Sequence, residues 1–171
     1  MILSMKKCGR FLMMLAGFLF LSGLVTWPAM ANCYNSAEYE AEQGLRIQSE
    51  LMVIALNCQH MAYRKGNLYI RYREISRQKE DLLKGYENTL MEYFRRKGSG
   101  NPESSLNDLR TNLANAVAIK SAQMRPDIFC YQNRDRIEAA LEMNTEQFRQ
   151  WAKTPSVGDP TSQPLCRDRD Y

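Results

Sequence analysis

The sequence of 171 residues contains a single histidine, His60. One histidine excludes a metal site built on two imidazoles and the paired Glu-x-x-His motifs of di-metal helical bundles. No two cysteines have the CxxC spacing of a thioredoxin-like redox motif or a c-type haem site. No serine lies in the strand-to-helix turn that a hydrolase nucleophile requires. The side chain of His60 is instead expected to bond a backbone carbonyl at the end of its helix.

Nearly all of the excess positive charge lies in the first 31 residues. They contain Lys6, Lys7 and Arg10 and no acid. Setting these three aside from the 23 lysines and arginines leaves 20 cations against 19 acids, so the net charge falls from +4 to +1. A nearly neutral remainder gives no electrostatic reason to expect binding to nucleic acid.

The same 31 residues have the parts of a cleavable signal peptide. After the basic residues, an uncharged apolar stretch runs from Phe11 to Val25, and Ala29 and Ala31 precede the expected cleavage site before Asn32. The stretch is short for an uncleaved membrane anchor, and Asn32 in front of Cys33 argues against a lipoprotein. The sequence therefore predicts a periplasmic or secreted protein. Its expected parts are a signal peptide (1–31), a helical bundle domain (32–153) and a proline-rich C-terminal tail tethered by Cys166 (154–171).

Helical periodicity dominates the remainder, and no segment has the pattern of a strand. Asn35 with Glu38 forms a capping box, and Asn101 followed by Pro102 is a second start signal. The connections are short, so consecutive helices are expected to be antiparallel neighbours. The predicted fold class is all-α, an antiparallel up-down-up-down bundle of about four helices with two disulfides and an irregular tail. The expected helices cover residues 36–60, 68–97, 102–125 and 127–143, with a short segment after Asn144.

Four cysteines follow the expected cleavage site, an even number that predicts two disulfides in an oxidising compartment. A continuous helix would hold Cys33 and Cys58 roughly 35 Å apart at 1.5 Å per residue, whereas bridged Cα atoms lie about 5.5–6 Å apart. In the up-down-up-down order, Cys58 and Cys130 share one end of the bundle, and Cys33 and Cys166 share the other. The predicted pairs are therefore Cys58–Cys130 and Cys33–Cys166.

The region of the second expected helix is basic, with ten cations against five acids between residues 64 and 97. Tyrosines lie among the arginines, a combination that suits anionic lipid headgroups, anionic glycans or an acidic protein partner. The candidate binding surface comprises Tyr69, Arg71, Tyr72, Arg73 and Arg77. Alternatively, this face only solvates the bundle and complements an acidic face on the first helix, where Glu38, Glu40 and Glu42 are expected to be exposed.

Two glycines interrupt the first two expected helices, Gly44 and Gly85. Each costs about 1 kcal/mol relative to alanine inside a helix, which suggests a packing reason. A hairpin that turns near residue 64 would place the two glycines level with one another. We therefore expect the two helices to approach most closely there, unless each glycine is merely tolerated.

These observations favour a non-catalytic interaction module of the bacterial cell envelope, such as an adaptor, an inhibitor or a chaperone-like protein, without cofactor or metal. Its partner would be another envelope protein or an anionic envelope surface. Two alternatives remain open. A bundle can hold haem between His60 and a methionine of another helix, such as Met91, Met124 or Met143. Acids distant in the sequence can also converge to form an enzyme's active site.

Overall fold

The structure is a computed structural model, and it describes residues 32–61, 63, 66–154 and 160–166. The chain divides into two units, Met1–Met30 and Ala31–Tyr171, and every described residue belongs to the second. The expected signal peptide lies outside the described residues, as do residues 155–159 and 167–171 of the expected tail.

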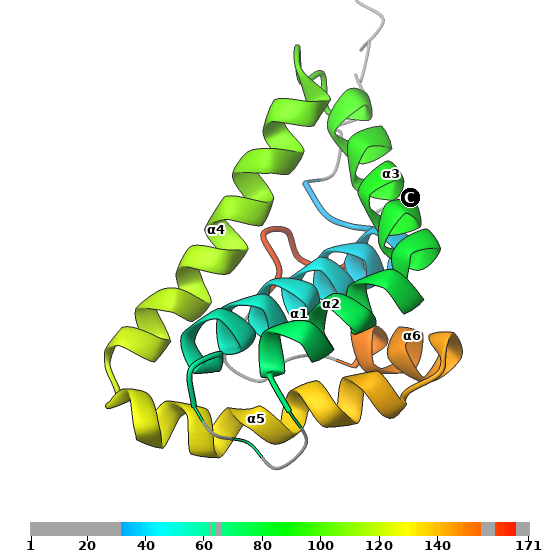
Figure 1. The fold of residues 1–171 in the computed structure, drawn as a ribbon. Helices are drawn as coiled ribbons and strands as arrows, with labels where there is room; N and C mark the ends of the chain where they lie inside the picture. The colour runs from blue at the N-terminus through cyan, green and yellow to red at the C-terminus, as the bar shows by residue number, and fades with distance from the viewer. Residues whose placement is uncertain (1–31, 62, 64–65, 155–159, 167–171) are drawn as a thin grey trace, which may run out of the picture. The chain divides into compact units, whose positions relative to one another are not determined.

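The described part of the chain contains six α-helices and no strand (Figure 1). Capping residues and prolines explain where all of them start except the third, which has no side-chain cap. The capping box of Asn35 and Glu38 is confirmed, and Pro102 and Pro126 each occupy the first helical position, where a missing N–H costs nothing. The helices are α1 (Ser36–Cys58), α2 (Leu68–Gln78), α3 (Glu80–Arg96), α4 (Pro102–Ala122), α5 (Pro126–Glu142) and α6 (Thr145–Lys153).

The single helix expected over residues 68–97 is bent at Lys79 into α2 and α3. Backbone hydrogen bonds continue through the bend, from the Lys79 N–H to the Ile75 carbonyl and from the Leu83 N–H to the Lys79 carbonyl. The Lys79 side chain is buried, and its Nζ donates to the Met143 carbonyl at 2.6 Å. Met143 is the C-cap residue of α5, so the Lys79 ammonium supplies a donor at a helix end, where carbonyls lack partners within the helix.

The helix α1 is central and packs against each of the other five helices. It buries 14 of its 23 residues, which is too many for a helix that buries one stripe. In Figure 1, α3 and α4 diverge from their shared loop, and α5 runs from the far end of α4 towards α6. The predicted all-α class is confirmed, but in the described part of the chain α1 and five helices packed around it replace the bundle of about four that was expected.

Both predicted disulfides are confirmed. Cys58 and Cys130 join the end of α1 to the first turn of α5, with Cα atoms 5.6 Å apart. Cys33 and Cys166 join the start of α1 to the tail, with Cα atoms 5.0 Å apart. Such bonds persist in oxidising, extracytoplasmic compartments. None of the helices in the described part of the chain combines the length and the apolar content needed to cross a membrane.

The tail residues 160–166 are irregular, as expected, and lie against the start of α1. The Tyr34 N–H donates to the Pro164 carbonyl at 2.8 Å, and the Cys166 N–H donates to the Tyr34 carbonyl at 2.8 Å. The Tyr34 side chain is fully buried and its hydroxyl bonds that of Ser162 at 2.9 Å. The tail is therefore part of the fold over this stretch.

The packing reason expected for the two interior glycines is found at Gly44 but not at Gly85. A Cβ atom on Gly44 would lie 2.2 Å from the Cε2 atom of Tyr86, so only glycine fits where α1 meets α3. Gly85 is exposed, and a Cβ atom there would meet nothing within 4 Å. Gly44 thus packs against the side chain of Tyr86, the residue after Gly85, and not against Gly85 itself.

Candidate functional site

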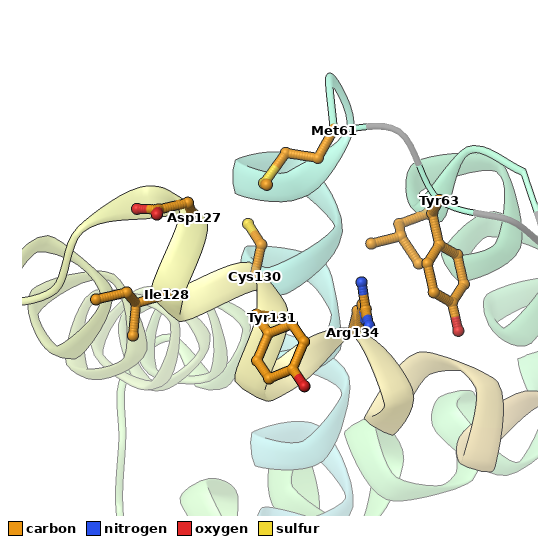
Figure 2. A pocket seen from close by; sticks show the side chains of 8 residues that line it. Met61, Tyr63, Asp127, Ile128, Cys130, Tyr131 and Arg134 are labelled. Atoms are coloured by element: carbon orange, nitrogen blue, oxygen red, sulfur yellow. The ribbon is translucent and has the colours of Figure 1, made fainter.

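An apolar cavity of about 380 Å³ lies beside the Cys58–Cys130 disulfide, where the end of α1 meets the first turns of α5 (Figure 2). Its volume lies within the range of about 300–1,000 Å³ that is typical of ligand sites. Most of its lining is aliphatic or aromatic, with one acid and one arginine. The lining residues are Met61, Tyr63, Leu68, Asp127, Ile128, Cys130, Tyr131 and Arg134.

The two sides of α5 explain how the cavity forms. Phe129, Cys130 and Ile137 are buried against the other helices, and the disulfide fixes this side of α5 to α1. Ile128, Tyr131 and Arg134 follow one another at intervals of three residues, so they share the adjacent face of the helix. This face borders the cavity instead of entering the core.

Several large apolar side chains around the cavity are exposed to solvent. The exposed fraction is 41% for Met61, 42% for Ile128 and 69% for Tyr131. Single exposed apolar residues are ordinary, but a group of them around a cavity is typical of a surface that binds a partner.

Arg134 is held between two aromatic rings. Its guanidinium carbon lies 4.9 Å from the ring centroid of Tyr131 and 5.3 Å from that of Tyr63, and Figure 2 shows the group between the two rings. Cation–π attraction accounts for this position. The buried Nε atom has no hydrogen-bond partner among the described residues, and it forms an ion pair with Asp135 at 3.9 Å, which is beyond hydrogen-bond distance. The arginine is therefore oriented by the two rings, and within the described residues its guanidinium group donates no hydrogen bond to a carboxylate.

The two acids near the cavity have partners. Asp127 accepts hydrogen bonds from Nε and Nη2 of Arg125 at 3.2 and 2.9 Å. Asp135 accepts a hydrogen bond from the Tyr63 hydroxyl at 3.3 Å. In the described part of the protein, both acids thus accept hydrogen bonds, whereas Arg134 of the cavity lining donates none to a carboxylate.

The acids of α1 form a second group of functional candidates, and their expected exposure is wrong. Glu38, Glu40 and Glu42 are 2%, 6% and 0% exposed. Glu38 forms an ion pair with Arg96 of α3. The sequence suggested a solvated face because these acids lie close together on one helix, but α1 is covered on several sides and each acid meets a partner from elsewhere in the chain.

Glu40 connects α1 to α3 and α6. Its carboxylate accepts hydrogen bonds from Tyr86 and Arg149, both at 2.9 Å, and Lys153 lies 3.7 Å away. Burial alone would raise the pKa of Glu40, but the hydrogen bonds from Arg149 and Tyr86 outweigh it and hold the pKa below its ordinary value. Burial and the hydrogen bond to Glu40 raise the pKa of Tyr86. The pair is therefore an ionised carboxylate and a neutral phenol.

Glu42 anchors the tail. Its carboxylate accepts a hydrogen bond from the Ser162 N–H at 2.7 Å and another from the Ser162 hydroxyl, and Arg46 forms an ion pair with it at 3.1 Å. One alternative was that acids distant in the sequence converge to form an active site. The acids of α1 do meet distant segments, but each forms an ion pair or accepts hydrogen bonds there. Their contacts are those of groups that connect the elements of the fold.

All five predicted surface residues lie on α2, and several of them have partners within the fold. Tyr69 and Tyr72 are partly buried and pack against the core, and Arg71 forms an ion pair with Glu138 of α5. Arg73 and Arg77 are exposed, and Arg77 pairs with Glu74 of its own helix. The cavity instead uses α5, whose sequence signal is the shared spacing of Ile128, Tyr131 and Arg134.

His60 lies exposed in the turn after α1, which ends at Cys58 and not at residue 60. Its side chain makes no hydrogen bond within the described residues, so the expected bond to a helix carbonyl is not formed. Of its possible haem partners, Met91 packs against the core and Met124 is exposed. No group of three or more metal-ligating side chains occurs among the described residues.

Comparison of the chain with protein-family models, with curated proteins and with solved structures gives no match. The function is therefore inferred from the chemistry of the site.

Proposed function

We propose that the protein is an exported, non-catalytic interaction module of the bacterial cell envelope, and that the cavity between α5 and the segment joining α1 to α2 receives its partner. The observation that carries this proposal is the exposure of Met61, Ile128 and Tyr131 around a cavity of about 380 Å³. Apolar surface of this kind is costly to leave in water, and a partner that covers it gains binding free energy.

Two features support export. Residues 1–31 have the composition of a signal peptide, and two disulfides connect the segments that follow. In a reducing compartment these bonds would be lost, since cytosolic thiols are kept reduced. We therefore place the working protein in the periplasm or outside the cell.

The framework of the cavity supports a binding function. The Cys58–Cys130 disulfide fixes α5 to the end of α1, and Cys130 belongs to the cavity lining, so this side of the cavity needs little ordering when a partner binds. A preformed site loses less conformational entropy on binding than one that must be assembled. The buried acids of α1 support a non-catalytic function, because ion pairs and hydrogen bonds to the fold occupy them.

Photo-crosslinking tests the proposal. A photoreactive amino acid is placed at Tyr131, and in a control at Leu165, which is 48% exposed and lies beside Tyr34 at the opposite end of α1. We expect a discrete crosslinked partner in the envelope from position 131 and none from position 165. Equal products from both positions would contradict the proposal. A haem absorption band in the purified exported protein would contradict it in favour of the cofactor-binding alternative.

A further inference from the structure

We infer that the cavity binds the carboxy-terminal residue of a polypeptide, with the terminal carboxylate on Arg134 and an apolar final side chain in the cavity. This inference rests on the proposed function and specifies the chemistry of the partner. It follows from the state of Arg134, from the lining of the cavity and from the distribution of negative charge around it.

The first step is the orientation of Arg134. The rings of Tyr63 and Tyr131 lie against its guanidinium group. The N–H groups of a guanidinium lie in its plane. The Nε atom is buried but the side chain as a whole is 35% exposed, so the terminal Nη groups are the donors that a ligand can reach. Arginine pairs with a carboxylate through two parallel hydrogen bonds in this plane. The Asp135 carboxylate, at 3.9 Å from Nε, is too far away to supply them.

The second step is the apolar cavity next to this cation. Leu68 and Cys130 are each 2% exposed and form its inner lining, while Met61 and Ile128 line it nearer to solvent. A ligand must therefore place an apolar group and a carboxylate within a few ångströms of one another. An anion without an apolar group would leave this lining in water.

The third step is the geometry of a polypeptide. Successive side chains of an extended chain point to opposite sides, so an internal acid next to an apolar residue directs its carboxylate away from its neighbour's side chain. At the last residue, the carboxylate and the side chain are attached to the same Cα atom. A chain end with an apolar final residue thus presents both groups together.

The final step is the charge around the cavity. Asp127 lines it, and Asp135 lies next to Arg134 in the sequence and accepts from Tyr63. These carboxylates repel a second negative charge on the ligand. They favour a final residue that carries only its terminal carboxylate, such as Leu, Ile, Val, Met or Phe.

Fluorescence anisotropy with labelled hexapeptides tests the inference. Five peptides end in Leu, Ile, Val, Met or Phe, and each is made with a free carboxylate and as the carboxamide. The exported protein, with both disulfides intact, is expected to bind at least one acid at least tenfold more tightly than its amide. Arg134→Gln should remove this difference, and Arg134→Lys should retain part of it. Arg77→Gln, which changes an exposed arginine outside the cavity lining, should have no effect.

Three outcomes would overturn the inference: no acid binds, acid and amide bind alike, or Arg134→Gln leaves the difference unchanged. Circular dichroism and thermal unfolding establish that the variants are folded. The proposed function is tested separately, through the partner crosslinked at position 131. If that partner binds equally well when a Gly-Ser-Gly-Ser extension follows its last residue, the terminal-carboxylate inference fails and the proposed interaction module stands. If no partner is found and no peptide binds, both fail.

Discussion

Substitution of Gly44 by alanine is expected to destabilise the fold, whereas the same substitution at Gly85 is expected to stabilise it. Both glycines lie inside helices. At Gly44 a Cβ atom would lie 2.2 and 2.5 Å from two ring carbons of Tyr86, and at Gly85 it would meet nothing within 4 Å. The Tyr86 ring is buried, and its hydroxyl bonds Glu40, so it cannot move aside without losing a contact.

The expected magnitudes follow from two opposing effects. Alanine in place of glycine favours a helix by about 1 kcal/mol. Overpacking a core costs about 1–3 kcal/mol, and a separation of 2.2 Å is far below the optimal carbon–carbon distance of about 3.5–4.0 Å. Taking the upper end of that range, Gly44→Ala should lower the free energy of unfolding by about 2 kcal/mol. Gly85→Ala should raise it by about 0.5–1 kcal/mol.

Urea unfolding with intact disulfides, followed by circular dichroism, measures both values. A double-mutant cycle isolates the contact: when Tyr86 is replaced by leucine, the Gly44→Ala substitution should lose most of its destabilising effect. If Gly44→Ala stabilises the protein as much as Gly85→Ala does, or if its effect is the same in the Tyr86→Leu background, the close packing of α1 on α3 is refuted.

Three further predictions concern the tail, the acids and the amino terminus. Glu42→Gln should lower the free energy of unfolding by roughly 1–3 kcal/mol, because the buried carboxylate bonds Ser162 and Arg46; unchanged urea unfolding, with Glu146→Gln as an exposed control, would count against the anchoring of the tail. The pKa of Glu40 lies below its ordinary value of 4.5, so its stabilisation is present above that pH and is lost as the pH falls through its folded-state pKa. Urea unfolding at pH 7 and pH 3 should show a smaller loss for Glu40→Gln than for the wild type, and equal losses would refute this. Intact-mass measurement of the exported protein should give a chain that begins at Asn32, and a species that keeps residues 1–31 would contradict the expected cleavage.

The disulfide pairing could be predicted although the expected bundle was too simple. The prediction depended only on which helix ends meet. Cys58 lies at the end of α1 and Cys130 in the first turn of α5, and these two ends meet in the six-helix arrangement as well. The prediction of the Cys33–Cys166 pair likewise required only that the tail return to the start of α1.

The burial of the α1 acids could not be predicted from local sequence. Helical periodicity predicts which residues share a face, but not how many neighbours the helix has. Glu38 and Glu40 are buried because Arg96 and Arg149 approach them from α3 and α6. The bend at Lys79 was missed for a similar reason, since the carbonyl that its ammonium bonds belongs to Met143, 64 positions away.

The candidate site shows the same limit. The basic composition of residues 64–97 predicted a binding surface there but not the partners of its residues within the fold: Arg71 forms an ion pair with Glu138, and Tyr72 packs against the core. The spacing of Ile128, Tyr131 and Arg134 was visible in the sequence. The sequence could not show that these residues line a cavity, because the cavity exists only where Met61 and Leu68 from other segments meet this face of α5.

The most direct test of the central claim is the affinity of the protein for the partner crosslinked at position 131, measured for two matched variants. Ile128→Asp places a charge in the cavity lining, and Ile70→Asp places one at a more exposed apolar residue outside that lining. If the cavity is the binding site, Ile128→Asp should weaken binding at least tenfold and Ile70→Asp should leave it unchanged. Equal affinities for the two variants would contradict the claim.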